Sequence, residues 1–388
     1  MSRPALEVAD ILHAQGSRYL ERHQSSISYQ QLKAFRAVSR CRTAALGGHL
    51  DVCLHCGLQT GISYNSCRNR HCPKCQAGAR ERWLQARQQE LLDTSYFHVV
   101  FTVPHELNPL ALTSPAVFYD LLFSATAQTL LEVAANPKHL GAEIGFLSIL
   151  HTWGQNLLLH PHIHCVVPAG GLSPDHKRWI GTRHSFLLPI HVLHKVFRGK
   201  FTAGLKNLHR KGLLNCNGPA ACFAQPKQFA QLLRTVHRED WVVYAKQAMG
   251  GPAQVLRYLG RYTHRIAISN HRLIAFDGQD VTFRWKDYAH GGRKRPMTLE
   301  APEFLRRFFL HVLPKGFVRI RHFGLLSNRF RAQLLPLART LLAQHRGHEL
   351  SEPERKTPSD EAPLWHCPKC GGPMSVLRRL DPREINSS

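Results

Sequence analysis

The chain has 388 residues, of which 43% are hydrophobic and 20% charged, a composition typical of a globular protein with two or three domains rather than a disordered one. Lysine and arginine outnumber aspartate and glutamate by 51 to 26, so the net charge of +25 favours a polyanionic partner, either nucleic acid or an anionic membrane surface. No membrane association is expected, because no apolar run approaches the roughly 18–20 residues of a spanning helix.

The cysteines are distributed unevenly along the chain. Six of the 11 lie between Cys41 and Cys75, and two more are Cys367 and Cys370. The first residues lack the apolar core of a signal peptide, so we expect a cytoplasmic protein whose cysteines stay reduced and bind metal rather than form disulfides. The pattern predicts a Cys-rich domain over residues 1–92, a larger domain over 93–345, and a charged linker with a CxxC tail over 346–388.

The apolar pattern predicts both strands and helices in the middle of the chain. Period-two runs indicate strands, longer amphipathic runs indicate helices, and Asp277-Gly278 favours a hairpin turn. We therefore expect an α+β fold with a mostly antiparallel central sheet and flanking helices. The predicted helices cover 77–92, 116–134 and 250–265, and the predicted strands cover 96–104, 144–154, 162–171, 241–245, 272–276, 281–285 and 317–324.

Two CxxC pairs in the first domain have the spacing of a four-cysteine zinc site. Cys53 and Cys56 are followed after fifteen residues by Cys72 and Cys75. Each CxxC turn presents two thiolates to one ion, and two such turns complete a tetrahedron with no open position. The spacing therefore predicts a structural Zn²⁺ held by these four residues.

Four further candidate ligands, Cys41, His49, Cys67 and His71, lie close by in the sequence. They form a second site, supply a replacement ligand to the first, or are structural; the spacing does not distinguish these alternatives. The region is basic, and a small basic zinc module is typical of nucleic-acid binding, with Arg68 and Arg70 as candidate DNA contacts. A structural or protein-binding zinc domain is the alternative.

A second candidate metal site lies in the predicted strand that contains His162 and His164. Alternate residues of a strand point to the same face, so these two imidazoles can hold one divalent ion and leave positions open for a substrate. If the preceding run forms a hairpin with this strand, Gln155 becomes the candidate third ligand. His151 and His160 compete with Gln155 for that place.

Tyr258 and Tyr262 lie four residues apart on one face of the helix predicted over 250–265. An apolar stripe in the same helix supports a plain packing role for both. However, Arg257, Arg261 and Arg265 occupy the same turns, and their charges can hold phosphates and ease ionisation of a phenol. A tyrosine in this setting, facing a phosphate polarised by metal, is a candidate nucleophile.

Taken in order, the Cys-rich basic head, the strand FHVVFTVP, the element HPHIH followed by Gly-Gly, and YLGRYTHR resemble one family. They are similar to the two-tyrosine transposases of the insertion sequence 91 type, within the HUH superfamily. In that family HUH denotes His-hydrophobic-His, matched here by His162, Ile163 and His164, and the paired tyrosines match Tyr258 and Tyr262.

The resemblance implies a bacterial enzyme that cleaves and rejoins single-stranded DNA at hairpin-like element ends, associated with the nucleoid when bound. A Mg²⁺ or Mn²⁺ on the histidines would polarise the phosphate, and a tyrosine would form a 5′-phosphotyrosine and free a 3′-OH. This chemistry drives rolling-circle-like transposition. Two alternatives remain: a plasmid rolling-circle initiator or relaxase with the same chemistry, and a non-catalytic zinc-dependent DNA-binding regulator. In the tail, Cys367 and Cys370 with His366 make an incomplete zinc site. Another segment or another chain completes it, or it binds no metal.

Overall fold

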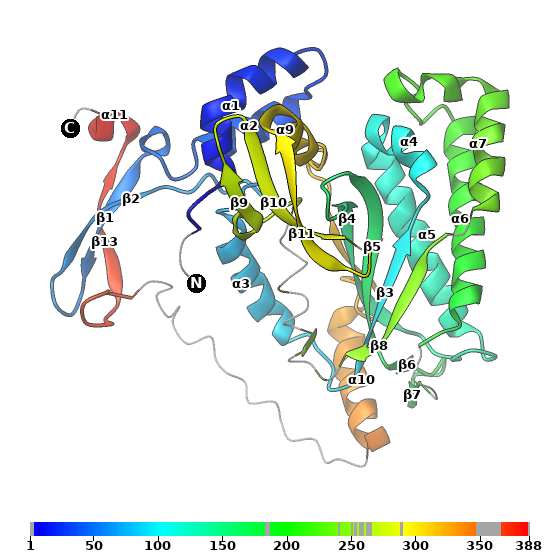
Figure 1. The fold of residues 1–388 in the computed structure, drawn as a ribbon. Helices are drawn as coiled ribbons and strands as arrows, with labels where there is room; N and C mark the ends of the chain where they lie inside the picture. Colours follow the sequence, from blue (N-terminus) through cyan, green and yellow to red (C-terminus); the bar gives the residue numbers. More distant parts are fainter. Residues whose placement is uncertain are drawn as a thin grey trace.

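The computed structural model describes residues 4–182, 187–239, 241–249, 251, 254–255, 260, 266–287, 290–346 and 366–386. Its centre is a five-stranded sheet in the order β12-β4-β5-β3-β8, in which every neighbouring pair of strands is antiparallel. Helices flank this sheet, which confirms the predicted α+β class (Figure 1). The five strands are β3 (Tyr96–Thr102), β4 (Gly145–Trp153), β5 (Leu159–Pro168), β8 (Val243–Met249) and β12 (Ile320–Gly324).

One face of the central sheet is apolar and is covered by a layer of helices. Strand residues alternate between faces, so Phe97 and Phe101 of β3 enter this core while His98 points to the other side. Phe101 makes an edge-to-face contact with Phe197, with ring centroids 5.0 Å apart. Buried aromatic rings of this kind supply much of the apolar area that stabilises a core. The covering helices are α4 (Asn108–Thr113), α5 (Pro115–Ala135), α6 (Ile190–Arg210) and α7 (Pro226–Arg238).

A second layer lies on the other side of the sheet and joins the start of the chain to residues 266–309. Ile11, Phe283 and Phe304 share one buried cluster, because an N-terminal helix packs on a helix that follows a small sheet. The predicted hairpin turn is present: the Asp277 carboxylate accepts backbone N–H groups at 2.7 and 2.8 Å, and Gly278 has φ +98°. The elements are α1 (Val8–His23), α2 (Tyr29–Ser39), β9 (Leu273–Phe276), β10 (Asp280–Asp287), β11 (Arg293–Glu300) and α9 (Ala301–Phe309).

A third sheet is formed by strands from both ends of the chain. Strand β13 (Met374–Leu380) of the tail pairs antiparallel with β1 (Gly48–Cys53), which also pairs with β2 (Gln59–Tyr64). Figure 1 shows this sheet at the left, with the red C-terminal strand beside the blue N-terminal strands. The sequence predicts a separate tail, whereas its residues 366–386 fold against the Cys-rich domain. We call the sheet of β1, β2 and β13, with the turns around its cysteines, the ribbon.

The remaining elements connect these layers. Helix α3 leads from the Cys-rich region to the central sheet, as the sequence predicts, and α10 closes the lower end of the molecule as drawn in Figure 1. Within the part of the chain that the structure describes, no helix combines the length and the apolar character needed to span a bilayer. These elements are α3 (Gln76–Gln88), β6 (Gly170–Leu172), β7 (Trp179–Gly181), α10 (Arg331–Arg346) and α11 (Pro382–Asn386), with short 3₁₀ turns at Ala44–Leu46, His105–Leu107, Gly218–Ala224 and Asn270–Arg272.

Candidate metal centres

Eight cysteines form two separate clusters, and this grouping differs from the predicted single site. Cys72 and Cys75 lie with Cys41 and Cys67, not with the other predicted CxxC pair. We call these four residues the head cysteine cluster. Cys75 Sγ is 3.5 Å from the Sγ atoms of both Cys41 and Cys67. A zinc tetrahedron with Zn–S bonds of about 2.3 Å has S···S edges of about 3.8 Å, so this spacing fits one Zn²⁺.

The head cysteine cluster lies inside the second core of the protein. Cys41 and Cys72 are fully buried in the same apolar cluster as Ile11 and Phe283. Cys75 immediately precedes α3, so the cluster also fixes where that helix begins. A metal here would hold together the N-terminal helices, the small sheet and the helix leading to the central sheet.

The other predicted pair, Cys53 and Cys56, meets Cys367 and Cys370 of the tail. We call these four residues the ribbon cysteine cluster. Its Sγ–Sγ distances are 3.5 Å between Cys53 and Cys370 and 3.7 Å between Cys56 and Cys367. Backbone N–H groups of Cys56 and His55 donate to Cys53 Sγ at 3.4 Å and lower the pKa of that thiol to about 6, which favours the thiolate that binds metal.

The two candidate histidine ligands of this region have other partners. His71 Nδ1 donates to Asn69 Oδ1 at 3.0 Å, and His71 Nε2 accepts the backbone N–H of Leu313 at 3.2 Å. Burial lowers the pKa of His71 to about 3, so the ring is a neutral structural bridge. His49 Nε2 lies 3.6 Å from a carboxylate oxygen of Asp51. Neither histidine belongs to a cysteine cluster in the described residues.

The candidate DNA contacts Arg68 and Arg70 differ in environment. Arg68 is exposed, with a backbone φ of +51°. The Arg70 guanidinium donates to the carbonyl oxygens of Phe317 at 2.6 Å and Pro314 at 3.0 Å. Arg70 therefore contacts the loop before β12 and contributes to packing between the head and the central domain.

Three histidines form a cluster on the central sheet, on the face away from α4–α7. His151 of β4 pairs in register with His162 of β5, and His164 follows on the same face of β5. Their candidate ligand nitrogens lie within 4.8 Å of one another. Sequence reasoning predicted His162 and His164 and favoured Gln155 over His151 and His160 as the third ligand. His151 instead completes the described cluster, while Gln155 lies in the turn beyond the end of β4.

Hydrogen bonds orient the rings of this cluster. His162 Nδ1 donates to the carbonyl oxygen of His160 at 2.6 Å, which places the lone pair on Nε2. His164 Nδ1 lies 2.8 Å from Nε2 of His98 on β3. Burial lowers the pKa of His162 to about 3 and holds the pKa of His164 well below its usual range. The rings of His162 and His164 are therefore neutral at physiological pH, the form in which imidazole binds metal.

The predicted tyrosines lie outside the described residues, together with Arg257, Arg261 and Arg265, but two neighbours are described. Val255, three residues before Tyr258, is fully buried in a cluster with Ile149 and Val166, which flank the histidines on the same sheet face. Gly260, two residues after Tyr258, approaches Leu84 of α3 so closely that a Cβ there would lie 3.0 Å from Leu84 Cδ1. The chain on both sides of Tyr258 is thus anchored beside the face that carries the histidines.

Two features of these centres escaped sequence reasoning. The sequence could have indicated the position of His98, because strand periodicity places it on the opposite face from Phe97 and Phe101. A sequence pattern could also have predicted that the two ends of the chain pair. Cys53–Gly57 and Cys367–Gly371 share the pattern C-x-x-C-G, which Cys72–Gln76 lacks. Gly57 and Gly371 both adopt positive φ, +68° and +72°, so the shared glycine reflects one turn geometry.

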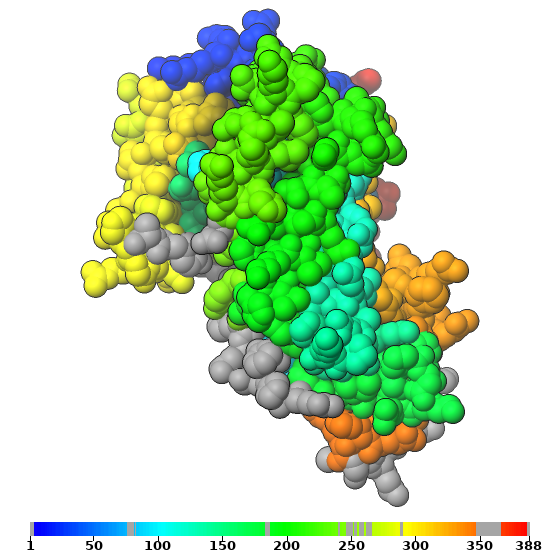
Figure 2. Space-filling model, turned by 90° about the vertical axis from the view of Figure 1, so that its right-hand side faces the viewer, coloured from blue at the N-terminus to red at the C-terminus, as the bar shows by residue number. Residues whose placement is uncertain are grey.

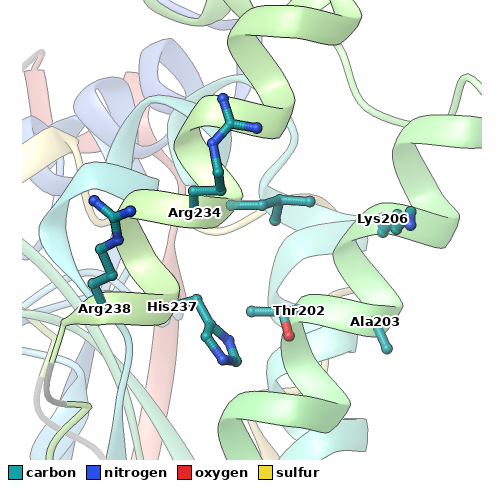
Figure 3. Close-up of a pocket in the computed structure, with 7 residues that line it drawn as sticks. Thr202, Ala203, Lys206, Arg234, His237 and Arg238 are labelled. Atoms are coloured by element: carbon teal, nitrogen blue, oxygen red, sulfur yellow. The ribbon is translucent and has the colours of Figure 1, made fainter.

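A surface hollow of about 410 Å³ lies between α6 and α7, in the helical layer on the other side of the sheet from the histidines (Figure 3). Lys206, Arg234 and Arg238 line it together with His237, and no carboxylate does. Figure 3 shows the side chains of Arg234 and Arg238 on α7 across from Lys206 on α6. This basic hollow contributes to the positive charge of the protein but is separate from the metal centres.

Comparison with known proteins identifies the class. Residues 145–333 match a family model described as "Putative transposase", and residues 11–103 match one described as "Transposase zinc-binding domain". The protein named "Putative transposase y4qJ" of Sinorhizobium fredii is 51% identical over 342 residues, covering 88% of this chain and 85% of that protein. The transposase for insertion sequence element IS801 of Pseudomonas savastanoi pv. phaseolicola is 28% identical over 76% of this chain and 70% of its own length. No solved structure matches.

These matches define a DNA transposase with an N-terminal zinc-binding domain. The chain belongs to the insertion sequence 91 family of transposases. DNA binding follows from this membership and agrees with the net charge of +25.

Proposed function

We propose that this transposase cleaves and rejoins single-stranded DNA by the HUH mechanism, through a 5′-phosphotyrosine intermediate, during rolling-circle-like transposition. The observation that carries the proposal is the histidine cluster on a sheet face beside which the chain flanking Tyr258 is anchored. A tyrosine from the segment between Val255 and Ile266 would need to reach only this face to attack a phosphate held there.

The donor set fits a divalent transition ion. The imidazoles of His151, His162 and His164 would supply three nitrogen ligands and leave further coordination positions for phosphate oxygens. Mg²⁺ prefers oxygen ligands, so this set is a better match for Mn²⁺. When bound, the metal would act as a Lewis acid that polarises the scissile phosphate.

Different residues of the chain would then have different roles in the reaction. The phenol oxygen of Tyr258 or Tyr262 would release its proton to solvent and form the bond to phosphorus, while the P–O3′ bond breaks and the leaving 3′-oxygen takes a proton from solvent. The phosphate stays on the tyrosine as a diester, so its bond energy is kept for rejoining. Arg257, Arg261 and Arg265 would hold the phosphates of the strand, as guanidinium groups do. His160 and His98 would keep His162 and His164 in the ligand orientation.

The surface beside the sheet supports a single-stranded substrate. Figure 2 shows atoms of the central sheet in a recess between the yellow strands β10 and β11 and the light green segment of α7 and β8. On β10 and β11, exposed Lys286 stands directly opposite exposed Lys294. On β8, Tyr244 is 53% exposed, and an exposed aromatic side chain can stack on a base.

The test is covalent trapping on a single-stranded oligonucleotide. Labelled strands from the ends of the element are incubated with the full chain and Mn²⁺, then denatured and resolved on a gel. Label migrating with the protein is expected, and it should be lost in Tyr258→Phe or Tyr262→Phe but kept in the control Tyr29→Phe, whose ring is 72% exposed on α2. Tight binding without an adduct under any metal would contradict the proposal.

A further inference from the structure

We propose that the two ends of the chain jointly build a second structural zinc site, in which Cys53 and Cys56 of the head and Cys367 and Cys370 of the tail hold one Zn²⁺. Neither family match reaches the tail, since the matched regions end at residue 333. The site is also independent of the strand-cleavage proposal, because it shares no residue with the histidine cluster or the tyrosine segment.

The two halves of the site have the same backbone geometry. In the head half, the N–H of Gly57 donates to Cys53 O at 3.0 Å and the N–H of Cys53 donates to Leu58 O at 2.9 Å. In the tail half, the N–H of Gly371 donates to Cys367 O at 2.9 Å and the N–H of Cys367 donates to Gly372 O at 2.8 Å. Two turns of one kind, facing each other, present four sulfurs in the arrangement that a tetrahedral ion requires.

The sulfurs of both halves accept backbone N–H groups in the same way. The N–H groups of His55 and Lys369, two residues after the first cysteine of each pair, donate to Cys53 Sγ and Cys367 Sγ at 3.4 Å. The N–H of Gly372 donates to Cys370 Sγ at 3.4 Å. Hydrogen bonds of this kind orient ligands and tune their charge in metal sites. Sγ–Sγ distances of 3.5–3.7 Å are far too long for disulfides, whose S–S bond is about 2.0 Å.

The strand of the tail buries little apolar surface against the head. Val376 and Leu377 of β13 are 48% and 51% exposed, and every residue of the strand is at least partly exposed. The tail meets the head through the β1–β13 ladder, a bond from Leu54 N–H to Pro373 O at 3.0 Å, the contact of α11 with the turn at Ala44–Leu46, and the four cysteines. A strand with so little buried apolar area needs another source of binding energy, and four thiolate–zinc bonds provide it.

Docking the tail has a defined consequence for the surface of the head. In the register of β1 and β13, Arg378 lies opposite Leu50 and Arg379 lies opposite His49. Zinc at the ribbon cysteine cluster would therefore fix two arginines beside the head, and loss of the metal would release them with the tail. The chain would be closed into a metal-locked ring that runs from Cys53 to Cys370.

The first test counts metal in the untagged, full-length protein purified under reducing conditions. Cys367→Ser/Cys370→Ser should contain one zinc per chain fewer than the wild type, and Cys53→Ser/Cys56→Ser should show the same loss. Cys216→Ser/Cys222→Ser, whose cysteines lie outside both clusters, is the matched control and should keep the wild-type count. An unchanged zinc count in the tail variant would overturn the proposal.

The second test uses wild-type cysteines and so does not depend on how a variant folds. A specific protease site is inserted after Pro358, within the linker of residues 347–365, and the protein is cleaved there. The C-terminal fragment should co-elute with the body in size-exclusion chromatography and separate after a zinc chelator is added. Release before chelation, or release by a reducing agent alone, would overturn the proposal. DNA cleavage is not measured in either test, so failure here is distinguishable from failure of the proposed function.

Discussion

His151 on β4 stands directly opposite His162 on β5, with their ring centroids 5.4 Å apart and the rings nearly perpendicular. This cross-strand pair converts the local motif of His162 and His164 into a three-nitrogen cluster. An antiparallel pair brings opposite side chains on one face within about 4.5–5.5 Å at their Cβ atoms, so the register alone suffices to place the third ring.

The proposed third ligand can be separated from its competitors by substitution. His151→Ala should reduce DNA cleavage roughly 10²–10³-fold, because losing a ligand of a catalytic metal costs several kcal/mol of transition-state stabilisation. Gln155→Ala and His160→Ala should stay near wild-type rate, since Gln155 lies in the turn and His160 contributes its backbone carbonyl. Cleavage rates at saturating Mn²⁺, with DNA affinity measured in parallel, give the result. A defect in Gln155→Ala that exceeds that of His151→Ala would restore Gln155 as the ligand.

His98 would act as a positioning residue of the proposed metal site, because its Nε2 lies 2.8 Å from Nδ1 of His164. His98→Ala should weaken Mn²⁺ affinity about 10–100-fold, the usual effect of removing an outer-shell partner. His98→Gln, which keeps a polar group in reach, should recover part of the loss. Titrating Mn²⁺ in the cleavage assay measures the shift. A role in folding alone would instead lower the melting temperature and leave the Mn²⁺ midpoint unchanged.

The basic pair on β10 and β11 should affect DNA binding through charge. Lys286→Gln/Lys294→Gln should weaken single-strand affinity and lower the slope of log K against log salt by about 1.4, since each lost phosphate contact removes about 0.7 on single strands. Lys138→Gln/Lys211→Gln, on exposed positions of the helical layer, is the charge-matched control. Fluorescence anisotropy at several salt concentrations checks the slopes. Equal slopes in both variants would show that these lysines do not contact phosphate.

Buried His311 should make the fold sensitive to acid. Its Nε2 donates to Leu157 O at 3.0 Å, its Nδ1 accepts from Thr152 Oγ1 at 3.1 Å, and burial lowers its pKa to about 4. In the unfolded chain this histidine has a pKa of about 6.5, so below that pH the unfolded state binds more protons than the folded state. The free energy of unfolding is therefore highest above pH 6.5 and falls as the pH drops towards 4. The expected loss at pH 5 is roughly 2 kcal/mol.

Denaturant unfolding of the wild type and His311→Gln between pH 5 and 7.5 tests this expectation. The variant should be less stable at neutral pH but should lose less stability than the wild type on acidification, because its amide does not titrate. Parallel pH profiles for the two proteins would show that His311 is not responsible.

Local patterns were sufficient for much of the fold. Strand periodicity in residues 96–104, 144–154 and 162–171 predicted β3, β4 and β5, and Asp277-Gly278 predicted the turn between β9 and β10. These predictions succeed because alternation of faces and turn geometry depend on residues adjacent in the chain. The same alternation placed His162 and His164 on one face of a strand. The transposase family was indicated instead by a resemblance of the ordered motifs, from the Cys-rich head to YLGRYTHR.

The sequence by itself thus determined the class of the fold, the family and the residue types available for metal binding. Only the tertiary structure decided which of those residues meet: Cys53 with Cys370 across 317 positions, Cys41 with Cys75, and His151 rather than Gln155 with His162. Ligand sets depend on strand register and on packing between distant segments, and neither is encoded in local spacing. CxxC spacing predicts that two cysteines bind the same ion, but tertiary contacts determine which residues supply the other two ligands.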